Sequence, residues 1–216
     1  MSLLTKEIKA QVRQALADLT TAVQLIVFTQ TLECPFCRET RELLEDIAGL
    51  SDHISVQVYN FVNDVQQAEK YGIDKIPALV ILGEKDYGIR FYGIPAGYEF
   101  TSLIHAIRLV GGVGSQLDQA TIDELQALSE PVHLQVFVTP TCPYCPQAVV
   151  LGFEMAFASP KVSVDAIESS EFQPLAIKYQ VAGVPLTIIN EKTRLEGAAP
   201  VPLVMDKIKE TVTVEE

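Results

Sequence analysis

The residues best suited to chemistry are four cysteines, which fall into two Cys-x-x-Cys pairs. The pairs are Cys34 with Cys37 and Cys142 with Cys145. A spacing of three at the start of a helix brings two sulfurs close together. Thiol–disulfide exchange needs one thiolate to attack a disulfide and a second thiol to resolve the mixed disulfide. Each pair therefore supplies both thiols of a redox couple.

Zinc binding is the main alternative use of these cysteines. Four-cysteine zinc sites usually hold their two pairs about 15–20 residues apart, whereas Cys37 and Cys142 are 105 positions apart. Zinc knuckles also favour a glycine after the second cysteine, and here Arg38 and Pro146 follow it. The histidines are scattered: His53, His105 and His133. The spacing favours redox chemistry and predicts no metal.

Three short motifs recur along the chain at a constant offset of 108 residues. The first copies are Cys34-Pro-Phe-Cys37, Lys70-Tyr71 and Ile76-Pro77. The second copies are Cys142-Pro-Tyr-Cys145, Lys178-Tyr179 and Val184-Pro185. Independent motifs that keep one offset indicate an internal repeat. The chain is therefore interpreted as a duplicated unit.

Apolar periodicity predicts the order β-α-β-α-β-β-α in each half, with an amphipathic helix in front of each. The strands predicted for the first half are Leu25–Thr29, Ser55–Phe61, Ala78–Leu82 and Ile89–Tyr92. Its predicted helices, after the N-terminal one, are Pro35–Ala48, Asp64–Tyr71 and Phe100–Val110. The strands predicted for the second half are Val132–Val138, Val162–Ile167, Leu186–Asn190 and Arg194–Glu196. Its predicted helices are Thr121–Leu128, Pro143–Phe157, Glu171–Tyr179 and Val201–Glu210.

Local signals mark helix starts and a boundary between the halves. Asp64 is a predicted helix cap, and Thr121 with Glu124 matches a capping box. The glycine-rich segment 111–115 is a short linker, which predicts one domain over residues 1–114 and a second over residues 115–216. A linker this short predicts that the two domains are packed together.

A strand that runs directly into a helix-opening Cys-x-x-Cys is typical of thioredoxin-like proteins. The sequence resembles the protein disulfide oxidoreductases of the glutaredoxin-like type, known mainly from thermophilic archaea and bacteria. The resemblance implies an α/β fold of two tandem thioredoxin folds, each a central mixed β-sheet flanked by helices. The segment from Tyr92 to Phe100 also looks like a family segment, although no chemistry is assigned to it.

The position of each cysteine predicts its role. Cys34 and Cys142 are the expected attacking thiols, because free N–H groups and the positive dipole at a helix N-terminus stabilise a thiolate. Cys37 and Cys145 are the expected resolving thiols, one turn further in and more buried. The prolines expected in the first helical turn are Pro35 and Pro143.

The Ile76-Pro77 and Val184-Pro185 pairs are predicted to bind substrate. In thioredoxin folds the matching proline is cis and lies against the Cys-x-x-Cys, and the resemblance implies the same here. A cis X-Pro bond exposes the backbone N–H and C=O of the preceding residue, so that a substrate peptide can pair with them. We therefore expect binding with little sequence preference.

The residues beside the two cysteine pairs differ. Glu33 precedes the first pair and Arg38 follows it, so their charges have opposite effects on a thiolate. Pro140 and Thr141 precede the second pair and Pro146 follows it, with no charge adjacent. We expect the two sites to differ in reduction potential, which depends on tertiary neighbours.

Composition limits the classes of partner. The net charge of −12 disfavours binding to a phosphate backbone, so no nucleic acid partner is expected. No stretch approaches the roughly 20 apolar residues that cross a bilayer, and the N-terminal helix lacks the short apolar region of a signal peptide. The sequence therefore predicts no membrane association and a cytoplasmic location.

The leading hypothesis is a thiol–disulfide oxidoreductase that reduces, forms or isomerises disulfides in protein substrates. No Gly-x-Gly-x-x-Gly is present, so no bound cofactor is expected beyond the disulfides Cys34–Cys37 and Cys142–Cys145. The resemblance implies that a separate thioredoxin-reductase-like flavoprotein supplies electrons, and that a peroxiredoxin is among the acceptors.

Two alternatives remain open. One is a glutathione-dependent glutaredoxin, which Cys-Pro-Tyr-Cys favours, although the Thr-Val and Gly-Gly pairs of glutaredoxins are absent around the prolines. The other is a non-catalytic redox-sensing or peptide-binding adaptor, which would not need the resolving thiol that both pairs retain.

Overall fold

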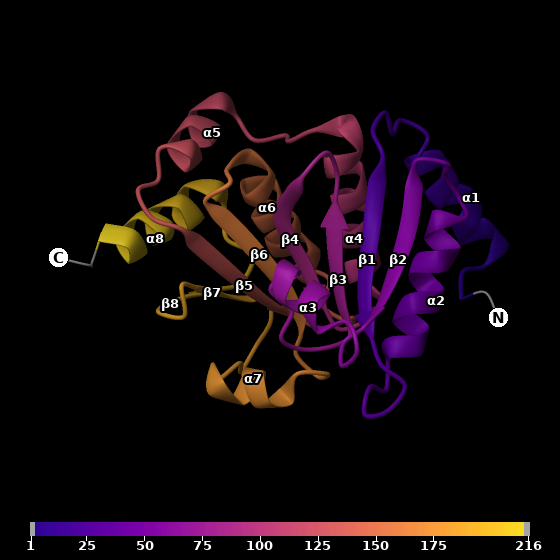
Figure 1. Ribbon diagram of the computed structural model, residues 1–216. Helices are drawn as coiled ribbons and strands as arrows, with labels where there is room; N and C mark the ends of the chain where they lie inside the picture. Colours follow the sequence, from indigo (N-terminus) through magenta and orange to yellow (C-terminus); the bar gives the residue numbers. More distant parts are fainter. Residues whose placement is uncertain (1–2, 214–216) are drawn as a thin grey trace.

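A computed structural model describes residues 3–213 as one mixed β-sheet with helices on both faces (Figure 1). The strands are β1 (Val23–Thr29), β2 (Ile54–Asn60), β3 (Ala78–Leu82), β4 (Asp86–Tyr92), β5 (Val132–Val138), β6 (Val162–Glu168), β7 (Leu186–Ile189) and β8 (Thr193–Glu196). The helices are α1 (Lys6–Ala15), α2 (Cys37–Ala48), α3 (Val65–Tyr71), α4 (Glu99–Arg108), α5 (Gln119–Gln126), α6 (Cys145–Ala158), α7 (Gln173–Lys178) and α8 (Val201–Thr213). A π-helical turn, η1 (Leu109–Val113), follows α4. None of the helices within residues 3–213 is long and apolar enough to cross a membrane.

The strand order is β2-β1-β3-β4-β6-β5-β7-β8, so each half contributes four adjacent strands. In each half the first strand pairs in parallel with the second and antiparallel with the third. The third and fourth strands form an antiparallel pair. The predicted α/β architecture with two repeats of the same element order is confirmed, and strand boundaries shift by a few residues.

The two halves join where β4 pairs in parallel with β6. Behind this pair, α4 lies beside α6 (Figure 1). Aromatic rings cross the joint: Phe91 meets Phe153 with ring centroids 5.1 Å apart, and Tyr87 stacks on Phe157 at 4.6 Å. The halves are thus packed together, as the short linker predicts.

The core lies on both faces of the sheet because successive strand residues point to opposite sides. In β1, Leu25 and Val27 pack with residues of α2 and α4, whereas Ile26 and Phe28 pack with residues of α3. All four side chains are buried. A near-continuous apolar strand is expected where helices cover both faces of a sheet.

The repeated Lys-Tyr motif has a packing role. The Tyr71 ring lies near the Phe28 ring, 6.2 Å between centroids, and Lys70 Nζ lies 4.7 Å from the Tyr71 centroid. The Arg90 guanidinium donates to the Tyr71 carbonyl at the end of α3. The equivalent group in the second half consists of Phe137, Lys178, Tyr179 and Arg194. Each copy fixes the end of a short helix to the sheet.

The structure corrects one predicted helix cap and confirms the position of the other. The N-cap of α5 is Asp118, whose Oδ1 accepts from the Thr121 backbone N–H at 2.8 Å, so the predicted Thr121–Glu124 capping box is wrong. Asp118 has the extended backbone that a cap requires, three residues before its donor. Asp64 does occupy the N-cap position of α3, but its carboxylate accepts from the Asn60 N–H at 2.7 Å.

The segment predicted as a linker is ordered and packed. The chain continues from α4 into η1, and the carbonyl of Gly111 accepts from the backbone N–H groups of Thr20 and Thr21. Gly112 has a φ of 108°, and a Cβ there would collide with the Thr20 side chain. Glycine is therefore required where the connection crosses the chain before β1.

Asp46 of α2 and Glu154 of α6 occupy equivalent positions in the two halves. Each carboxylate binds the chain that leads into the first helix of its half, α1 or α5. Asp46 accepts from the Leu3 N–H at 2.8 Å and from Lys9 Nζ at 3.0 Å. Glu154 accepts from the Gln116 N–H at 2.8 Å and lies 2.8 Å from His105 Nε2. Because His105 belongs to α4, the second anchor also ties the two halves together.

Candidate active sites

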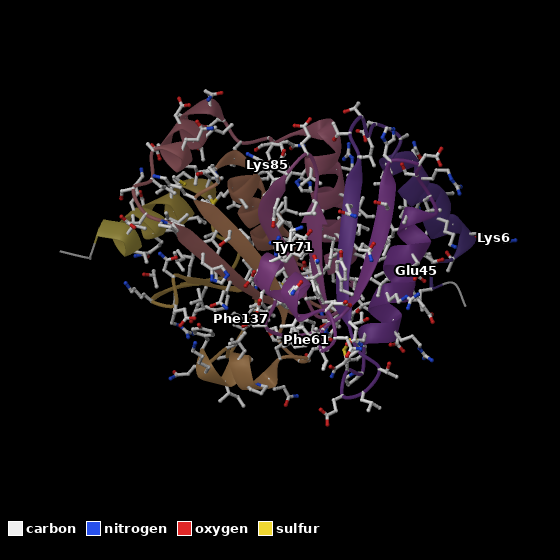
Figure 2. All side chains as sticks on the ribbon, in the orientation of Figure 1. Lys6, Glu45, Phe61, Tyr71, Lys85 and Phe137 are labelled. Atoms are coloured by element: carbon white, nitrogen blue, oxygen red, sulfur yellow. A yellow bond between two sulfur atoms is a disulfide. The ribbon has the colours of Figure 1, made fainter. Side chains whose placement is uncertain are left out.

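Both Cys-x-x-Cys segments lie at the same edge of the sheet, the one formed by the carboxyl ends of its parallel strands. The pairing pattern makes β1, β4, β6 and β5 run in the same direction, and the cysteines follow the carboxyl ends of β1 and β5. In Figure 2 the labelled Phe61, just after β2, and Phe137, near the end of β5, mark this edge, while Lys85 marks the opposite one. Strands β3, β4 and β6 separate the two centres.

In the first centre Cys34 and Cys37 form a disulfide. Cys37 is the first residue of α2 and is only 2% exposed, whereas Cys34 is partly exposed in the preceding turn. The Gln30 backbone N–H points to Cys37 Sγ at 3.4 Å. An accessible sulfur and a buried one are the arrangement expected of an attacking and a resolving thiol.

In the second centre Cys142 and Cys145 form a disulfide. Both are buried, with exposed fractions of 8% and 0%. The Cys145 N–H lies 3.1 Å from Cys142 Sγ, and the Val184 carbonyl oxygen lies 3.7 Å from the same sulfur. Cys142 therefore sits at a helix N-terminus and against the residue that precedes Pro185.

The Ile76–Pro77 and Val184–Pro185 peptide bonds are both cis, the state that the resemblance implies. The Pro77 carbonyl accepts from Gly93 N at 2.9 Å, and the Pro185 carbonyl accepts from Gly197 N at 2.8 Å. Both glycines have positive φ angles, 91° and 76°. The prolines thus directly precede β3 and β7, at the edge that carries the cysteines. Their substrate-binding role stays a prediction.

The helices begin later than predicted. Pro35 and Pro143 lie in turns before α2 and α6, which begin at Cys37 and Cys145. The expectation that both prolines occupy the first helical turn is therefore wrong. The Cys37 N–H donates to the Cys34 carbonyl at 3.4 Å, a turn-like bond that brings the two cysteines together before the helix starts.

A groove of about 660 Å³ borders the first disulfide. Cys34, Cys37, Arg38 and Arg41 line it together with the end of β2. Both guanidinium groups are exposed and paired with carboxylates of α2, Arg38 with Glu39 at 3.2 Å and Arg41 with a further glutamate at 2.7 Å. The groove thus presents polar and charged groups beside the sulfurs.

A buried carboxyl group near the second centre was not identified from the sequence. Glu99 is 2% exposed, and burial raises its pKa to about 7 against the opposing effect of the nearby Ser102 hydroxyl. The adjacent Tyr98 N–H donates to the Pro140 carbonyl at 3.0 Å, two residues before Cys142. The family-like segment from Tyr92 to Phe100 was the only sequence signal for this group.

A pair of carboxyl groups, Glu168 and Glu171, joins the ends of β4 and β6. Glu171 accepts from the Ile94 N–H at 2.7 Å, and the Glu171 N–H donates to Glu168 Oε2 at 2.6 Å. Burial raises the pKa of Glu171 to about 7; the Ile94 bond opposes the rise and the Glu168 charge adds to it. A Cβ at Gly93 would collide with the Glu168 side chain. The halves therefore meet at this edge through glycine and carboxyl groups.

In the described part of the chain, neither cysteine pair belongs to a wider cluster of candidate metal ligands. Within residues 3–213, no group of three or more His, Cys, Asp or Glu side chains is arranged to hold a metal ion. The chemistry that these centres offer is that of two disulfides in thioredoxin-type surroundings, which fits thiol–disulfide exchange.

A thioredoxin-domain family model matches residues 21–105 and again residues 132–210. The chain is 31% identical over 173 residues to the AhpF component of alkyl hydroperoxide reductase from Pseudomonas aeruginosa, a match that covers 79% of this chain and 31% of that protein. It is 27% identical to the Escherichia coli protein of the same name over 95% of this chain and 37% of the relative. The chain thus spans about a third of the length of these curated relatives.

Solved structures match over nearly the whole chain. A protein disulfide oxidoreductase from Aeropyrum pernix K1 superposes with a TM-score of 0.91 at 27% identity, covering 97% of this chain and 94% of that one. The AhpF component of alkyl hydroperoxide reductase from Enterococcus faecalis superposes with a TM-score of 0.88 at 26% identity, covering 95% and 99%. The chain therefore belongs to the thioredoxin-domain family, with one thioredoxin-fold unit in each half.

Proposed function

We propose that this protein is a thiol–disulfide oxidoreductase that acts on disulfides of protein substrates at both centres. The observation that carries the proposal is the shared layout of the two halves. Each half has a Cys-x-x-Cys disulfide at a helix start and a cis-proline strand at the same edge of the sheet. The resemblance to a protein disulfide oxidoreductase over both halves supports it.

In the reducing direction, the thiolate of Cys34 or Cys142 attacks a substrate disulfide. A mixed disulfide forms and one substrate thiolate leaves. Cys37 or Cys145 then attacks the mixed disulfide, which releases the second substrate thiol and closes the enzyme disulfide. Two electrons pass from the enzyme dithiol to the substrate, and an external reductant restores the dithiol.

Glu99 is the proposed proton acceptor for the second centre. The resolving Cys145 is fully buried and must lose its proton before it can attack. A carboxyl group with a pKa of about 7, held beside the loop that leads to Cys142, exchanges protons near neutral pH. Glu99 comes from the first half, so each half contributes to this centre.

The relatives suggest the redox partners. We propose that a separate flavoprotein reductase donates electrons and that a peroxiredoxin is one acceptor, in line with the similarity to the AhpF component of alkyl hydroperoxide reductase. We also propose a cytoplasmic location and a boundary between domains at residues 114 and 115, directly after η1.

Insulin reduction driven by dithiothreitol tests this function. Wild type is expected to accelerate precipitation of the insulin B chain, and the double variant Cys34→Ser, Cys142→Ser is expected to match the uncatalysed rate. An inactive wild type would contradict the proposal. The same assay with glutathione as the sole reductant tests the glutaredoxin alternative, which predicts that glutathione replaces dithiothreitol.

A further inference from the structure

A row of buried polar residues crosses the joint between the halves. Arg90 of β4 pairs in register with Asp165 of β6, which pairs in register with Gln135 of β5. Their exposed fractions are 9%, 7% and 5%. Strand positions at the centre of a sheet are usually apolar, so three adjacent polar residues indicate a built polar site.

These residues line a cavity of about 300 Å³ on the face of the sheet that carries α3. The first half contributes Arg90, Lys75 and Tyr92, and the second half contributes Gln135 and Asp165 among others. The cysteines do not line this cavity. It is thus a feature of the joint and distinct from both redox centres.

The two cations of the cavity wall are already neutralised. Arg90 makes a bidentate salt bridge with Asp86, at 2.9 and 2.6 Å, and donates to a backbone carbonyl of α3. Lys75 Nζ lies 2.6 Å from Asp74 and 3.8 Å from the centroid of the Tyr92 ring. Since each cation has a carboxylate of its own, the cavity is a poor receptor for an anion.

One buried acceptor of the cavity wall is unsatisfied in the described part of the chain. Within residues 3–213, the buried amide oxygen of Gln135 has no hydrogen-bond partner. Asp165 pairs with His133, whose Nε2 lies 2.8 Å from Oδ2. A buried acceptor without a donor destabilises the fold, so a native protein normally has a partner for it. The missing partner is a hydrogen-bond donor.

We propose that this cavity binds a small organic molecule through a primary ammonium group. Asp165 is its counter-ion and the Gln135 amide oxygen accepts one of its N–H bonds. An ammonium offers three donors and no acceptor, which suits an unsatisfied amide oxygen beside a carboxylate. The cavity volume suits a short aliphatic chain behind the ammonium. The ligand would contact Lys75, which directly precedes the Ile76–Pro77 bond.

Calorimetric titration with three four-carbon compounds tests the proposal. Putrescine, butanediol and succinate have similar lengths but carry ammonium, hydroxyl and carboxylate ends. Putrescine is expected to bind at least about tenfold more tightly than either of the others. In the same titration, followed by NMR, the side-chain amide resonances of Gln135 are expected to shift. Equal affinity for all three compounds, or no binding, would overturn the proposal and leave water as the occupant of the cavity.

Three variants distinguish putrescine binding at this site from nonspecific attraction of a cation to an acidic protein. Asp165→Asn and Gln135→Leu are each expected to weaken putrescine binding about tenfold or more. Asp52→Asn removes one exposed negative charge elsewhere and is the matched control, with binding unchanged. Circular dichroism confirms that each variant is folded. Equal weakening by Asp52→Asn, or unaltered binding in folded Gln135→Leu, would refute the site. Because binding is measured directly, the result does not depend on redox activity.

Discussion

The two redox centres have the same motif, helix start and cis proline, yet their surroundings differ. The first lies beside β2, a free edge of the sheet, next to an open groove with Arg38 and Arg41. The second follows β5, an interior strand of the sheet, where the chain before Cys142 contacts Tyr98 and Glu99 is buried. The two halves therefore share the same cysteine and proline motifs, but the packing between the halves gives each redox centre different neighbouring residues.

Removing the attacking cysteines is expected to have the largest effect. Cys34→Ser and Cys142→Ser each leave one working centre, and the double variant loses at least about a hundredfold of the insulin reduction rate. The two single variants therefore isolate the second and the first centre, respectively. Wild-type activity in one of them would mean that the silenced centre takes no part in this reaction.

Glu99→Gln is expected to slow the second centre alone. In the Cys34→Ser background, the rate at pH 7 falls roughly tenfold, because the buried proton acceptor is lost. The pH dependence near 7, the pKa of Glu99, disappears with it. In the Cys142→Ser background the same change leaves the first centre unaltered. An equal loss at both centres would show a structural effect and remove the proposed distinction.

Stability is expected to depend on pH through Glu99. Its carboxyl holds a proton up to about pH 7 in the folded protein but only to about 4.5 when unfolded, so unfolding between these values releases a proton. This contribution is fully present below pH 4.5 and is lost as pH rises to 7, at most about 3 kcal/mol. Urea unfolding at pH 5 and pH 8 measures it.

Glu99→Gln should reduce the difference in unfolding free energy between those two pH values. Glu196→Gln, at an exposed position, is the matched control and should preserve the wild-type difference. If Glu99→Gln also preserves it, the carboxyl is ionised in the folded protein, and the proposed proton transfer at the second centre fails.

The smallest effect is expected for the arginines of the first groove. Arg38→Gln with Arg41→Gln should lower the rate with an acidic disulfide peptide about two- to threefold, because exposed charges are screened by water and salt. The loss should shrink in high salt and vanish in the Cys34→Ser background. A loss that is independent of salt would indicate altered packing of α2.

Local motifs made much of the fold predictable. The cysteine pairs, the X-Pro pairs and the order of elements depend on residues close together in the sequence, and their common offset revealed the duplication. The α5 cap was misassigned because Asp118 and Thr121 are both good capping residues, and only the backbone conformation separates them.

The joint between the halves could not be predicted in the same way. Pairing of β4 with β6 brings together residues more than seventy positions apart, and no local signal marks an edge strand that will be covered. Glu99 shows the consequence for the site. A glutamate at a helix start is usually a solvated residue that favours the dipole. Its burial here depends on packing between the halves that only the fold reveals.

The joint between β4 and β6 also bears on how separate chains could associate through their edge strands. The free strands β8 and β2 are the counterparts of β4 and β6, so the same joint between separate chains would build an endless array. The internal joint buries Val149 and Phe153 of α6. At the equivalent positions of α2 stand Arg41 and Glu45, an exposed ion pair that such an array would have to desolvate. The charged pair on α2 therefore disfavours pairing of β2 with the β8 strand of another chain.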